Sequence, residues 1–573
     1  MRRVRLLVLG TVLFGAISGC AYGDRSTASA PGQPSPQAAE SGRTITLAFR
    51  FEPTDLSAKI VKPGSGGTPE PLFNAALVMV DNQRNPIPHL AEALPRLNTE
   101  SWRLFPDGRM ETTYKLRPNL TWHDGARLTA DDFVFAYRVY AFPALGVFQS
   151  KPQDQIEEVA AADARTIVIR WRSPYADAGI LDQGTLDPLP AHILSEAFQG
   201  MEQDPGTRES FLNLPFWTSA YVGAGPYRMV RWEPGTELEG VAFAGHALGK
   251  PRIERVIARI MADDNTTLTN VLSDAVQLAQ YYTLRFEQAQ VLRRDWVAPG
   301  QGIILLDPSS IPASIVQYRT EFLKTPALLD LRVRRALAYS MDRQSLQDAL
   351  FEGEGVVSHT FITPRESYFA DVDQRITKYP YNPRMTEQLM TEAGFVKDRD
   401  SLFADASGER FRPEFQAQSG SQFERHQSIM ADTWKRSGIE VQPTILPANL
   451  SRNNQTRTSF PGLGHTVFGN RGAEENLISV QIGTAANRWV GTNRGGWSNA
   501  EYDRLWEGYN LALDPSERQR NMVQMAVMAS EEVPALFLYY NFNVLAYSAA
   551  LHGPTLPGPG STNFWNVHEW TLQ

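Results

Sequence analysis

The chain has 573 residues, of which 42% are hydrophobic and 21% charged, and this composition excludes a disordered or fibrous protein for most of its length. A formal net charge of −8 argues against a surface built for nucleic acid, and the single Cys excludes an internal disulfide and a cage of thiolate metal ligands. A chain of this length accommodates about three or four domains or subdomains.

The N-terminus has the pattern of a lipoprotein export signal. Three arginines among the first five residues precede an apolar run at 6–17, which is too short for a membrane-spanning helix of about 20 residues. The run ends in Ile-Ser-Gly-Cys at 17–20, which resembles a bacterial lipobox. An ordinary signal peptide with a nearby Cys is the alternative, but the only Cys of the chain stands at this position. We therefore predict a signal peptide at 1–19 and a lipid on Cys20.

The next segment is a predicted tether. Residues 21–42 are small, polar and rich in Pro, so they cannot bury apolar surface. No later segment has about 18 uncharged apolar residues in a row, so we expect no further membrane span. A lipid, a tether at 20–42 and an acidic body predict a protein anchored to the cell membrane or its periplasmic face, outside the cytoplasm.

Strand and helix patterns alternate through the body from residue 43. The predicted strands and extended segments are 44–49, 112–117, 166–171, 251–260 and 535–547. The predicted helices are one after Thr129, with Asp132 completing a capping box, one over 333–341, one after Asp342, and two within 499–531. This alternation predicts a mixed α/β protein with several lobes.

No pattern of catalytic or metal-binding residues stands out. The nine His are scattered, and neither His-Glu-x-x-His nor Gly-x-Ser-x-Gly occurs. Residues 245–251 superficially resemble a phosphate loop, but the spacing is wrong and Pro251 removes a backbone donor. The adjacent acids Asp263 and Asp264 are better read as a helix cap. We therefore predict no enzyme, no metal and no cofactor.

Seven groups of motifs occur in a characteristic order. The strongest group joins Tyr-Lys-Leu-Arg-Pro at 114–118, Trp-His-Asp-Gly at 122–125 and Leu-Thr-Ala-Asp-Asp-Phe at 128–133. The others are 90–94 with 105–108, 222–227 with 232–235, 249–251 with 264–266, 329–343, 381–395 and 497–503. Together they resemble the family 5 extracellular solute-binding proteins, which are receptor subunits of peptide and nickel ABC importers.

The resemblance implies an α/β fold of the type II periplasmic-binding-protein kind, with two lobes that close about a hinge and an extra subdomain inserted in lobe I. The implied boundaries are 43–72, 186–305 and 535–573 for lobe I, 73–185 for the inserted subdomain, and 306–534 for lobe II. Closure would bury the ligand between the lobes, and ABC transporter permease subunits would recognise the closed form. We expect a monomer that binds a small molecule or peptide.

Three segments would line the cleft in this family, and here they are 50–54, 465–471 and 539–543. Peptide-binding members place an Asp in the second segment, usually after a Trp, to pair with the α-amine of the peptide. In this chain Phe468 replaces the Trp and Arg471 stands near the place of the Asp. An Arg there would repel an ammonium group and favour a carboxylate, phosphate or polyhydroxyl group.

Other acids remain as amine partners. Glu52 is one candidate, with a solvated loop acid as the alternative interpretation, and Glu474 or Glu475 would serve only if the register slips. The predicted ligand-binding residues are Arg50, Phe51, Glu52, Phe148, Trp217, Phe468, Asn470, Arg471, Arg488, Trp489, Trp497, Tyr540 and Asn541. For each Trp, packing in the core is the competing interpretation.

The sequence therefore predicts a lipid-anchored receptor for a small polar solute, with a peptide-like ligand as the first choice. A sugar or another anionic solute is the alternative ligand. A secreted hydrolase is a less favoured class, because it needs converging nucleophile and base residues. A role in signalling or as a chaperone would be separated from import only by a ligand assay and the neighbouring genes.

Overall fold

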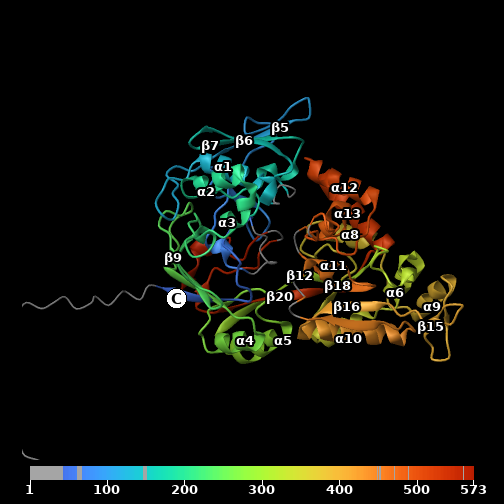
Figure 1. The fold of residues 1–573 in the computed structure, drawn as a ribbon. Helices are drawn as coiled ribbons and strands as arrows, with labels where there is room; N and C mark the ends of the chain where they lie inside the picture. The colour runs from blue at the N-terminus through green and yellow to red at the C-terminus, as the bar shows by residue number, and fades with distance from the viewer. Residues whose placement is uncertain are drawn as a thin grey trace, which may run out of the picture. The chain divides into compact units, whose positions relative to one another are not determined.

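We describe a computed structural model of the chain (Figure 1). The described residues are 43–573 without 58, 61–67, 146–150, 448–449, 451–452, 470–471, 488 and 559–560. The predicted signal peptide, Cys20 and the tether therefore lie outside the described residues. Among those that are described, no helix is both long and apolar enough to cross a membrane.

One large sheet organises the described chain, in the strand order β17-β16-β18-β12-β20-β11-β1-β10-β9-β8. These strands are β1 (Thr44–Phe49), β8 (Tyr227–Glu233), β9 (Glu237–Ala242), β10 (Arg255–Ile260), β11 (Leu278–Ala279), β12 (Gly302–Val316), β16 (Glu414–Gln418), β17 (Gln442–Leu446), β18 (Leu463–Phe468) and β20 (Tyr539–Ser548). Two short strands complete it: β13 (Val356–Val357) pairs with β20, and β19 (Ala535–Phe537) pairs with β12. We call β8–β11 with β1 the first half of the sheet, and β16–β18 the second half.

Strands β12 and β20 lie side by side in the middle and join the two halves. They are antiparallel from the pair Gly302↔Ser548 to the pair Ser310↔Asn541, with a register shift between Pro308 and Ser310. Beyond that bulge, β12 continues over 311–316 as the antiparallel neighbour of β18. A bulge bends a strand and increases its twist. The chain therefore changes direction where β12 passes from one half to the other.

A separate four-stranded sheet, in the order β4-β5-β7-β6, lies within the predicted inserted subdomain. Its strands are β4 (Trp102–Leu104), β5 (Met110–Lys115), β6 (Ile156–Asp163) and β7 (Thr166–Trp171). Helix α1 (Ala130–Tyr140) follows the turn at 122–125, and Asp132 Oδ2 accepts a hydrogen bond from Thr129 N at 2.9 Å. This bond is the acidic half of the predicted capping box.

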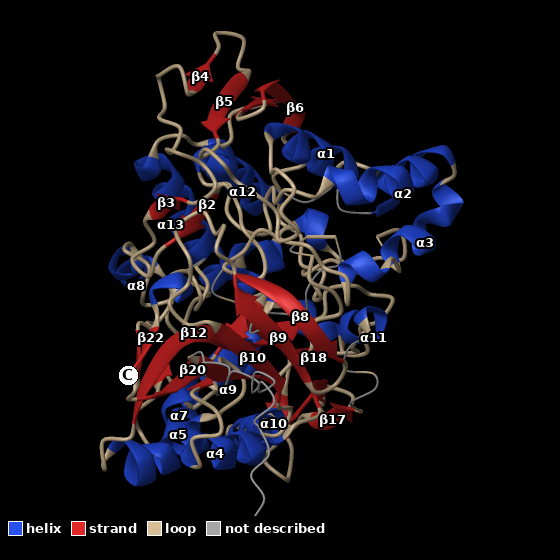
Figure 2. Cartoon of the chain, turned by 90° about the vertical axis from the view of Figure 1, so that its left-hand side faces the viewer, coloured by secondary structure: helices blue, strands red, loops and turns tan. Residues whose placement is uncertain are grey.

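The remaining helices cover the large sheet or extend from the smaller one. They are α2 (Ala191–Gln203), α3 (Arg208–Leu212), α4 (Asp264–Leu272), α5 (Phe286–Leu292), α6 (Leu331–Tyr339), α7 (Arg343–Phe351), α8 (Phe369–Arg375), α9 (Pro383–Glu392), α10 (Ser421–Arg436), α11 (Asn454–Thr458), α12 (Ala500–Leu511) and α13 (Pro515–Glu532). In Figures 1 and 2, α4, α5 and α10 lie along one side of the sheet, and α12 and α13 lie on the other side. Short antiparallel pairs are β2 (Val78–Val80) with β3 (Pro86–Pro88), β14 (Val396–Lys397) with β15 (Phe403–Ala404), and β21 (Leu551–His552) with β22 (Thr571–Leu572).

Acidic side chains start several of these helices, as the sequence predicted. Asp263 accepts a hydrogen bond from Thr266 N at 2.7 Å at the start of α4. Asp342 accepts one from Ser345 N at 3.0 Å at the start of α7. Each bond satisfies a backbone donor that the first turn of a helix leaves free. The reading of Asp263 as a helix cap is therefore confirmed.

The predicted strands are confirmed with small changes of boundary. The prediction of an extended segment over 251–260 was wrong for 251–254, since β10 begins only at Arg255. Pro251 has no N–H that could donate to a sheet. It follows a turn at Gly249, whose φ is +102°. The segment 535–547 forms two strands, β19 and β20, because pairing with β12 is interrupted at Leu538.

The buried apolar residues form separate clusters on the two halves. One large cluster joins β1, the four-stranded sheet, α1, α2 and the C-terminal segment. A second packs α6, α7 and α10 against the second half of the sheet, and a third lies beneath α12 and α13. A small cluster of α4 and α5 residues covers the other face of the first half. The proposed domain boundaries stay a prediction.

Candidate ligand-binding site

A buried carboxylate sits on β12 where the two halves of the sheet meet. Asp307 is fully buried, and its Oδ2 accepts hydrogen bonds from Tyr281 Oη at 2.9 Å and Ser309 Oγ at 2.7 Å. Its Oδ1 lies 3.1 Å from Arg365 Nη1. Asn543 of β20 donates to Ser309 Oγ at 2.9 Å. These bonds tie β12 and β20 to the loops around them. The place where these two strands join the halves of the sheet, which we call the crossing, is therefore a connected polar site.

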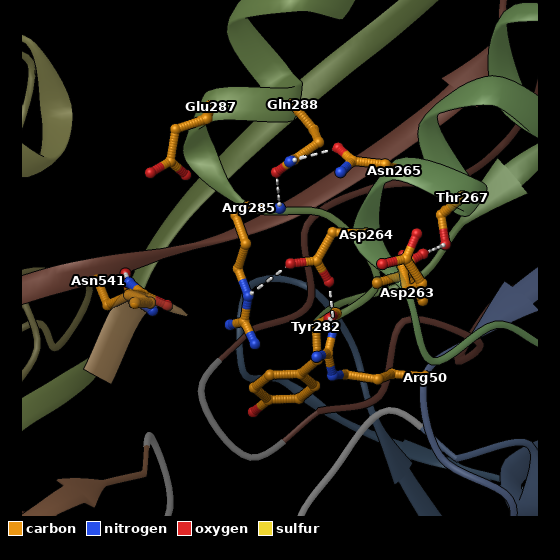
Figure 3. A network of polar contacts seen from close by, with 12 residues as sticks. Arg50, Asp263, Asp264, Asn265, Thr267, Tyr282, Arg285, Glu287, Gln288 and Asn541 are labelled. Carbon is orange, nitrogen blue, oxygen red and sulfur yellow. Dashed lines mark hydrogen bonds and ion pairs between the residues drawn. The ribbon is translucent and has the colours of Figure 1, made fainter. Parts of the chain in front are cut away.

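A second polar network surrounds Asp264 at the start of α4 (Figure 3). Arg50 forms an ion pair with Asp264 and also donates to Tyr282 O at 3.2 Å. Arg285 Nε lies 3.5 Å from the other oxygen of Asp264. Burial lowers the pKa of Arg285, and the nearby charge of Arg50 lowers it further. Two arginines thus share the carboxylate of Asp264, and two further acids, Asp263 and Glu287, belong to the same network.

Tyr282 in this network has a strained backbone. Its φ is +71°, a left-handed value that is uncommon for a residue other than Gly. The ring of Phe51 lies with its centroid 6.4 Å from that of Tyr282. Strained residues of this kind cluster at binding and catalytic sites. The segment 50–52 and Tyr282 are therefore candidates for ligand contact.

Glu52, predicted as an amine partner, already has two hydrogen-bond donors. Its Oε1 accepts from Trp232 Nε1 at 2.8 Å and from Gly235 N at 2.9 Å. These residues belong to the end of β8 and the turn into β9. The carboxylate thus fastens the segment after β1 to this hairpin, and a ligand amine would have to share it.

Four predicted binding residues lie in the hydrophobic core: Trp217, Phe468, Trp497 and Tyr540. Trp217 Nε1 donates to Phe211 O at 2.7 Å, and Tyr540 Oη donates to Ile362 O at 2.8 Å. Their polar atoms are therefore used inside the protein. The packing interpretation given above for each Trp describes Trp217 and Trp497, and Phe468 and Tyr540 are buried as well.

Two further predicted residues, Asn541 and Trp489, are partly exposed. Asn541 of β20 accepts a hydrogen bond from Gln422 Nε2 at 2.8 Å, which joins the crossing strand to α10. Trp489 has φ +62° and packs with Phe322 at a centroid distance of 6.1 Å. Both stay candidates for ligand contact. Phe148, Asn470, Arg471, Arg488 and the lipidation residue Cys20 lie outside the described residues, so those predictions have no structural account.

Two arginines that sequence reasoning missed, Arg457 of α11 and Arg494, lie beside the carboxyl ends of β16 and β18. Arg494 Nη1 donates to Thr466 Oγ1 at 2.9 Å. With its amide oxygen turned toward the guanidinium, Gln418 accepts from Arg457 Nη2 at 3.0 Å and from Nε at 3.1 Å. One sequence signal could have found this region: residues 441–473 contain no Asp or Glu.

Ion pairs connect the predicted inserted subdomain with the segment that carries α8, α12 and α13. Arg518 Nη2 of α13 lies 2.6 Å from Asp177 Oδ2, and Arg84 pairs with Glu366. Glu474 is close to both pairs, and burial raises its pKa to about 7. These contacts hold together parts of the chain that are far apart in sequence.

A cavity of about 230 Å³ lies away from the crossing strands. Its described lining comes from 68–80, 89, 182–184, 226, 246 and 561–568, so no described residue of the second half contributes. His89 Nε2 and His246 Nε2 are 3.2 Å apart in its wall, and burial lowers the pKa of His246 to about 4. Both rings are therefore neutral near pH 7. Among the described residues, no group of three or more His, Cys, Asp or Glu is arranged to hold a metal ion.

Comparison with known families decides the class of the protein. Residues 86–472, more than half of the chain, match the family model described as "Bacterial extracellular solute-binding proteins, family 5 Middle". The chain belongs to this family. The resemblance inferred from the motifs is therefore confirmed. The family consists of solute-binding proteins that are not enzymes, so the prediction of a binding protein holds for this chain.

Three relatives of this solute-binding protein match nearly all of its length. The oligopeptide-binding protein AppA of Bacillus subtilis is 22% identical over 99% of this chain and 97% of its own. Among solved structures, the oligopeptide binding protein of Thermus thermophilus, complexed with a pentapeptide, has a TM-score of 0.77 and 23% identity, and the match covers 92% of this chain and 96% of that one. NikZ of Campylobacter jejuni in complex with Ni(L-His) has a TM-score of 0.75 and 22% identity, with 92% and 99% coverage.

These likenesses show that this solute-binding protein has the mixed α/β periplasmic-binding-protein fold, as the sequence predicted. The family description also places it outside the cytoplasm. Which residues contact the ligand stays a prediction. The structure brings Arg50, Phe51 and Asn541 near the crossing of β12 and β20, and it adds Arg285, Tyr282, Arg457 and Arg494 as candidates.

Proposed function

We propose that the protein is the substrate-binding subunit of an ABC importer, held at the membrane by a lipid on Cys20, and that it captures a small, peptide-like solute between two closing lobes. The names of its relatives support an importer role, because they include oligopeptide-binding and nickel-complex-binding proteins. The anchor is supported by the lipobox-like sequence that precedes Cys20.

The observation that carries the proposal is the pair of strands that joins the two halves of the sheet. β12 pairs with β18 of the second half and β20 pairs with β11 of the first half, and β12 is bulged between Pro308 and Ser310. Hinge closure in binding proteins is absorbed by a few residues at the ends of such connecting elements. Rotation about this bulge would bring the two halves together around a ligand while most of the sheet keeps its hydrogen bonds.

A sugar or anionic solute is the second candidate, and a specific observation favours it. The acid predicted to hold a peptide amine, Glu52, already accepts two hydrogen bonds from Trp232 and Gly235. The Asp264 network, in contrast, contains the two guanidinium groups of Arg50 and Arg285. An anionic or hydroxylated solute would accept hydrogen bonds from guanidinium groups of this kind.

A thermal unfolding screen tests the ligand class. The mature chain with Cys20→Ser, which cannot be lipidated, would be heated with free-amine peptides, N-acetylated peptides and a pool of sugars. A ligand at 100 times its Kd adds about 2.7 kcal/mol to stability. For a protein of this size we expect a rise in Tm of a few degrees. A rise with peptides supports the first candidate, a rise with sugars or acetylated peptides only supports the second, and no rise in any pool contradicts both.

Closure can be measured on the same variant, because Cys20 is the only Cys of the chain. Glu100→Cys and Gln388→Cys introduce two labels at exposed positions, one in the predicted inserted subdomain and one on α9. We expect a ligand from the screen to shorten the distances measured between the two labels. A bound ligand that leaves these distances unchanged would contradict a closing mechanism.

The anchor has its own test. Mass spectrometry of the membrane-extracted protein should find a diacylated Cys as the first residue of the mature chain. Cys20→Ser should release the protein from the membrane fraction. An unmodified Cys20 in protein that remains in membranes would contradict the lipid anchor without touching the ligand-binding role.

A further inference from the structure

Arg457 and Arg494 lie next to each other at one end of the second half of the sheet. β16 and β18 are parallel, with Phe415 opposite Leu463 and Gln416 opposite Gly464. The same register places Gln418 beside Thr466 on one face of the sheet, because side chains alternate along each strand. Arg457 binds Gln418 and Arg494 binds Thr466, so the two guanidinium groups lie over this pair of strands, close enough for the charge of Arg457 to act on Arg494.

The position corresponds to the edge at which ligands bind in open α/β sheets. Ligands occupy the crevice outside the carboxyl ends of parallel strands, and Gln418 is the last residue of β16. On β18, Phe468 lies opposite Ile311 of β12, just beyond the bulge. The carboxyl ends of β16 and β18 therefore point toward the crossing of β12 and β20. Gln422 at the start of α10 contacts Asn541 of β20 from the same end.

Neither arginine has an acidic partner in the part of the chain that the structure describes. No ion pair joins Arg457 or Arg494 to a described Asp or Glu, and within that part their side chains hydrogen-bond to an amide and a hydroxyl. Burial lowers the pKa of Arg457. Burial and the neighbouring charge of Arg457 lower the pKa of Arg494 to about 9. Two partly buried cations are thus held together at a cost in desolvation and repulsion.

The groups around the arginines do not supply the missing negative charge. The residues between 441 and 473 include no Asp or Glu at all, whether described or not. Arg319, a third arginine of this region, donates to Arg494 O at 2.7 Å and to Gly483 O at 2.8 Å, so it is paired with carbonyl groups. His465 is buried, and burial with the charge of Arg457 lowers its pKa to about 4, so it is neutral near pH 7.

We propose that Arg457 and Arg494 receive an oxyanion of the transported solute, a carboxylate or a phosphate group. The inference rests on the proposed function, because it assumes that the solute enters at the crossing of β12 and β20. Guanidinium groups offer planar pairs of N–H donors that match the two oxygens of such an anion, and Thr466 adds a hydroxyl. An anion here balances two positive charges that have no acidic partner among the described residues.

The first test uses small anions and needs no knowledge of the ligand. The chain with Cys20→Ser would be unfolded thermally in sodium phosphate, sodium acetate and sodium chloride at one ionic strength and pH. We expect phosphate or acetate to raise Tm above the value in chloride, and the rise to be lost in Arg457→Met and Arg494→Met. Arg436→Met is the matched control, since Arg436 is an exposed arginine at the end of α10 that should not change the anion effect. An equal rise in wild type and in both variants would overturn the proposal.

The second test uses ligand pairs that differ only in the anionic group. A peptide found by the screen would be compared with its C-terminal amide, and a sugar phosphate with its free sugar. We expect the uncharged member to bind at least tenfold more weakly to the wild type, and the difference to disappear in Arg494→Met. Equal affinity of both members for the wild type would overturn the proposal. This comparison uses the wild-type protein alone, so it does not depend on whether a variant folds.

The two proposals fail in different ways. If a peptide binds tightly and its amide binds equally well, the importer subunit stands and the oxyanion site is wrong. If no pool of solutes raises Tm but the phosphate rise depends on Arg457 and Arg494, the oxyanion site stands and the peptide-like ligand is wrong. The preferred anion in the first test decides between carboxylate and phosphate.

Discussion

Arg518 and Asp177 form a two-point ion pair between residues 341 positions apart in the chain. Arg518 Nη2 lies 2.6 Å from Asp177 Oδ2, and Nη1 contacts the other carboxylate oxygen. The guanidinium also lies 4.2 Å from the ring centroid of Tyr509, and its side chain is only 22% exposed. Two parallel hydrogen bonds with little exposure make this a geometrically specific contact. It ties α13 to the loop that follows β7.

Because this pair joins parts on the two sides of the predicted cleft, its loss should weaken closure. We expect Arg518→Met to lower affinity for any ligand found in the screen by roughly three- to thirtyfold, which corresponds to about 0.7–2 kcal/mol. The control is Arg504→Met, because Arg504 pairs with Glu501 within α12, where both side chains are exposed. Isothermal titration of the two variants decides the point. Equal affinities would mean that the Arg518 pair makes no contribution to the bound state.

Asp307 should be essential for stability, because its carboxylate accepts the hydrogen bonds of Tyr281, Ser309 and Arg365. Asp307→Ala would leave Arg365 without its carboxylate and the Tyr281 hydroxyl without its acceptor. Removing one partner of a buried pair costs about 3–5 kcal/mol. Asp307→Asn keeps one acceptor and should cost less. The free energy of unfolding from urea titration measures both, and an alanine variant as stable as the wild type would contradict this role.

The buried carboxyl of Asp187 should make the protein less stable as the pH rises. Burial raises its pKa to about 7, although Gly184 N donates to Oδ2 at 2.7 Å. The folded state therefore holds a proton that the unfolded state releases near pH 4, so stability falls between about pH 4 and 7 and the full penalty applies above pH 7. Asp187→Asn should remove the penalty and stabilise the protein by about 2 kcal/mol at pH 8, with little change at pH 4.

The control for this pH effect is Asp107→Asn. Asp107 is an exposed acid whose pKa is lowered, chiefly by a hydrogen bond from the backbone N–H of Arg109. Its folded-state pKa lies below the unfolded value, so its contribution is present at neutral pH and is lost on acidification. Urea titrations at pH 4, 6 and 8 should therefore move in opposite directions for the two variants. A stability gain for Asp187→Asn that is the same at all three pH values would contradict titration of this carboxyl.

Gly225 is required by a close approach of two backbone segments. A Cβ at this position would lie 2.4 Å from Phe73 C and 2.5 Å from Asn74 N, and backbone atoms at that distance must move. We expect Gly225→Ala to destabilise the protein by more than about 2 kcal/mol. Gly200→Ala is the control, because Gly200 lies in α2 with nothing within 4 Å of the new Cβ. That exchange should stabilise by about 0.5–1 kcal/mol. Thermal unfolding that ranks the two variants the other way would contradict the backbone contact.

The sequence predicts the elements of this fold well where the signal is local. Thr129 with Asp132, Asp263 and Asp342 mark helix starts, because the cap depends on residues only a few positions away. Motifs spread over most of the chain then identified the family. The start of β10 was predicted too early because the extended pattern in the sequence reaches back to Pro251, which has no N–H to donate to a sheet.

The site was predicted less well, because it depends on contacts that are distant in sequence. An aromatic residue near a cleft motif has the same pattern whether it faces ligand or core, and Trp217 and Tyr540 both proved to be buried. Glu52 reads as an isolated acid in the sequence, yet its partner Trp232 is 180 residues away. Arg457 and Arg494 attracted no notice for the same reason. Only the fold shows that neither has a described carboxylate beside it.

The place of β20 in the sheet has a consequence for the order in which the protein acquires its structure. β20 is formed by residues 539–548, yet it lies in the middle of the large sheet between β12 and β11. Until those residues emerge during synthesis, β11 lacks its antiparallel neighbour and β12 lacks most of its pairing. The nascent chain therefore cannot join the two halves of its sheet before these residues are present. A central strand encoded last therefore delays completion of the large sheet until nearly the whole chain has been synthesised.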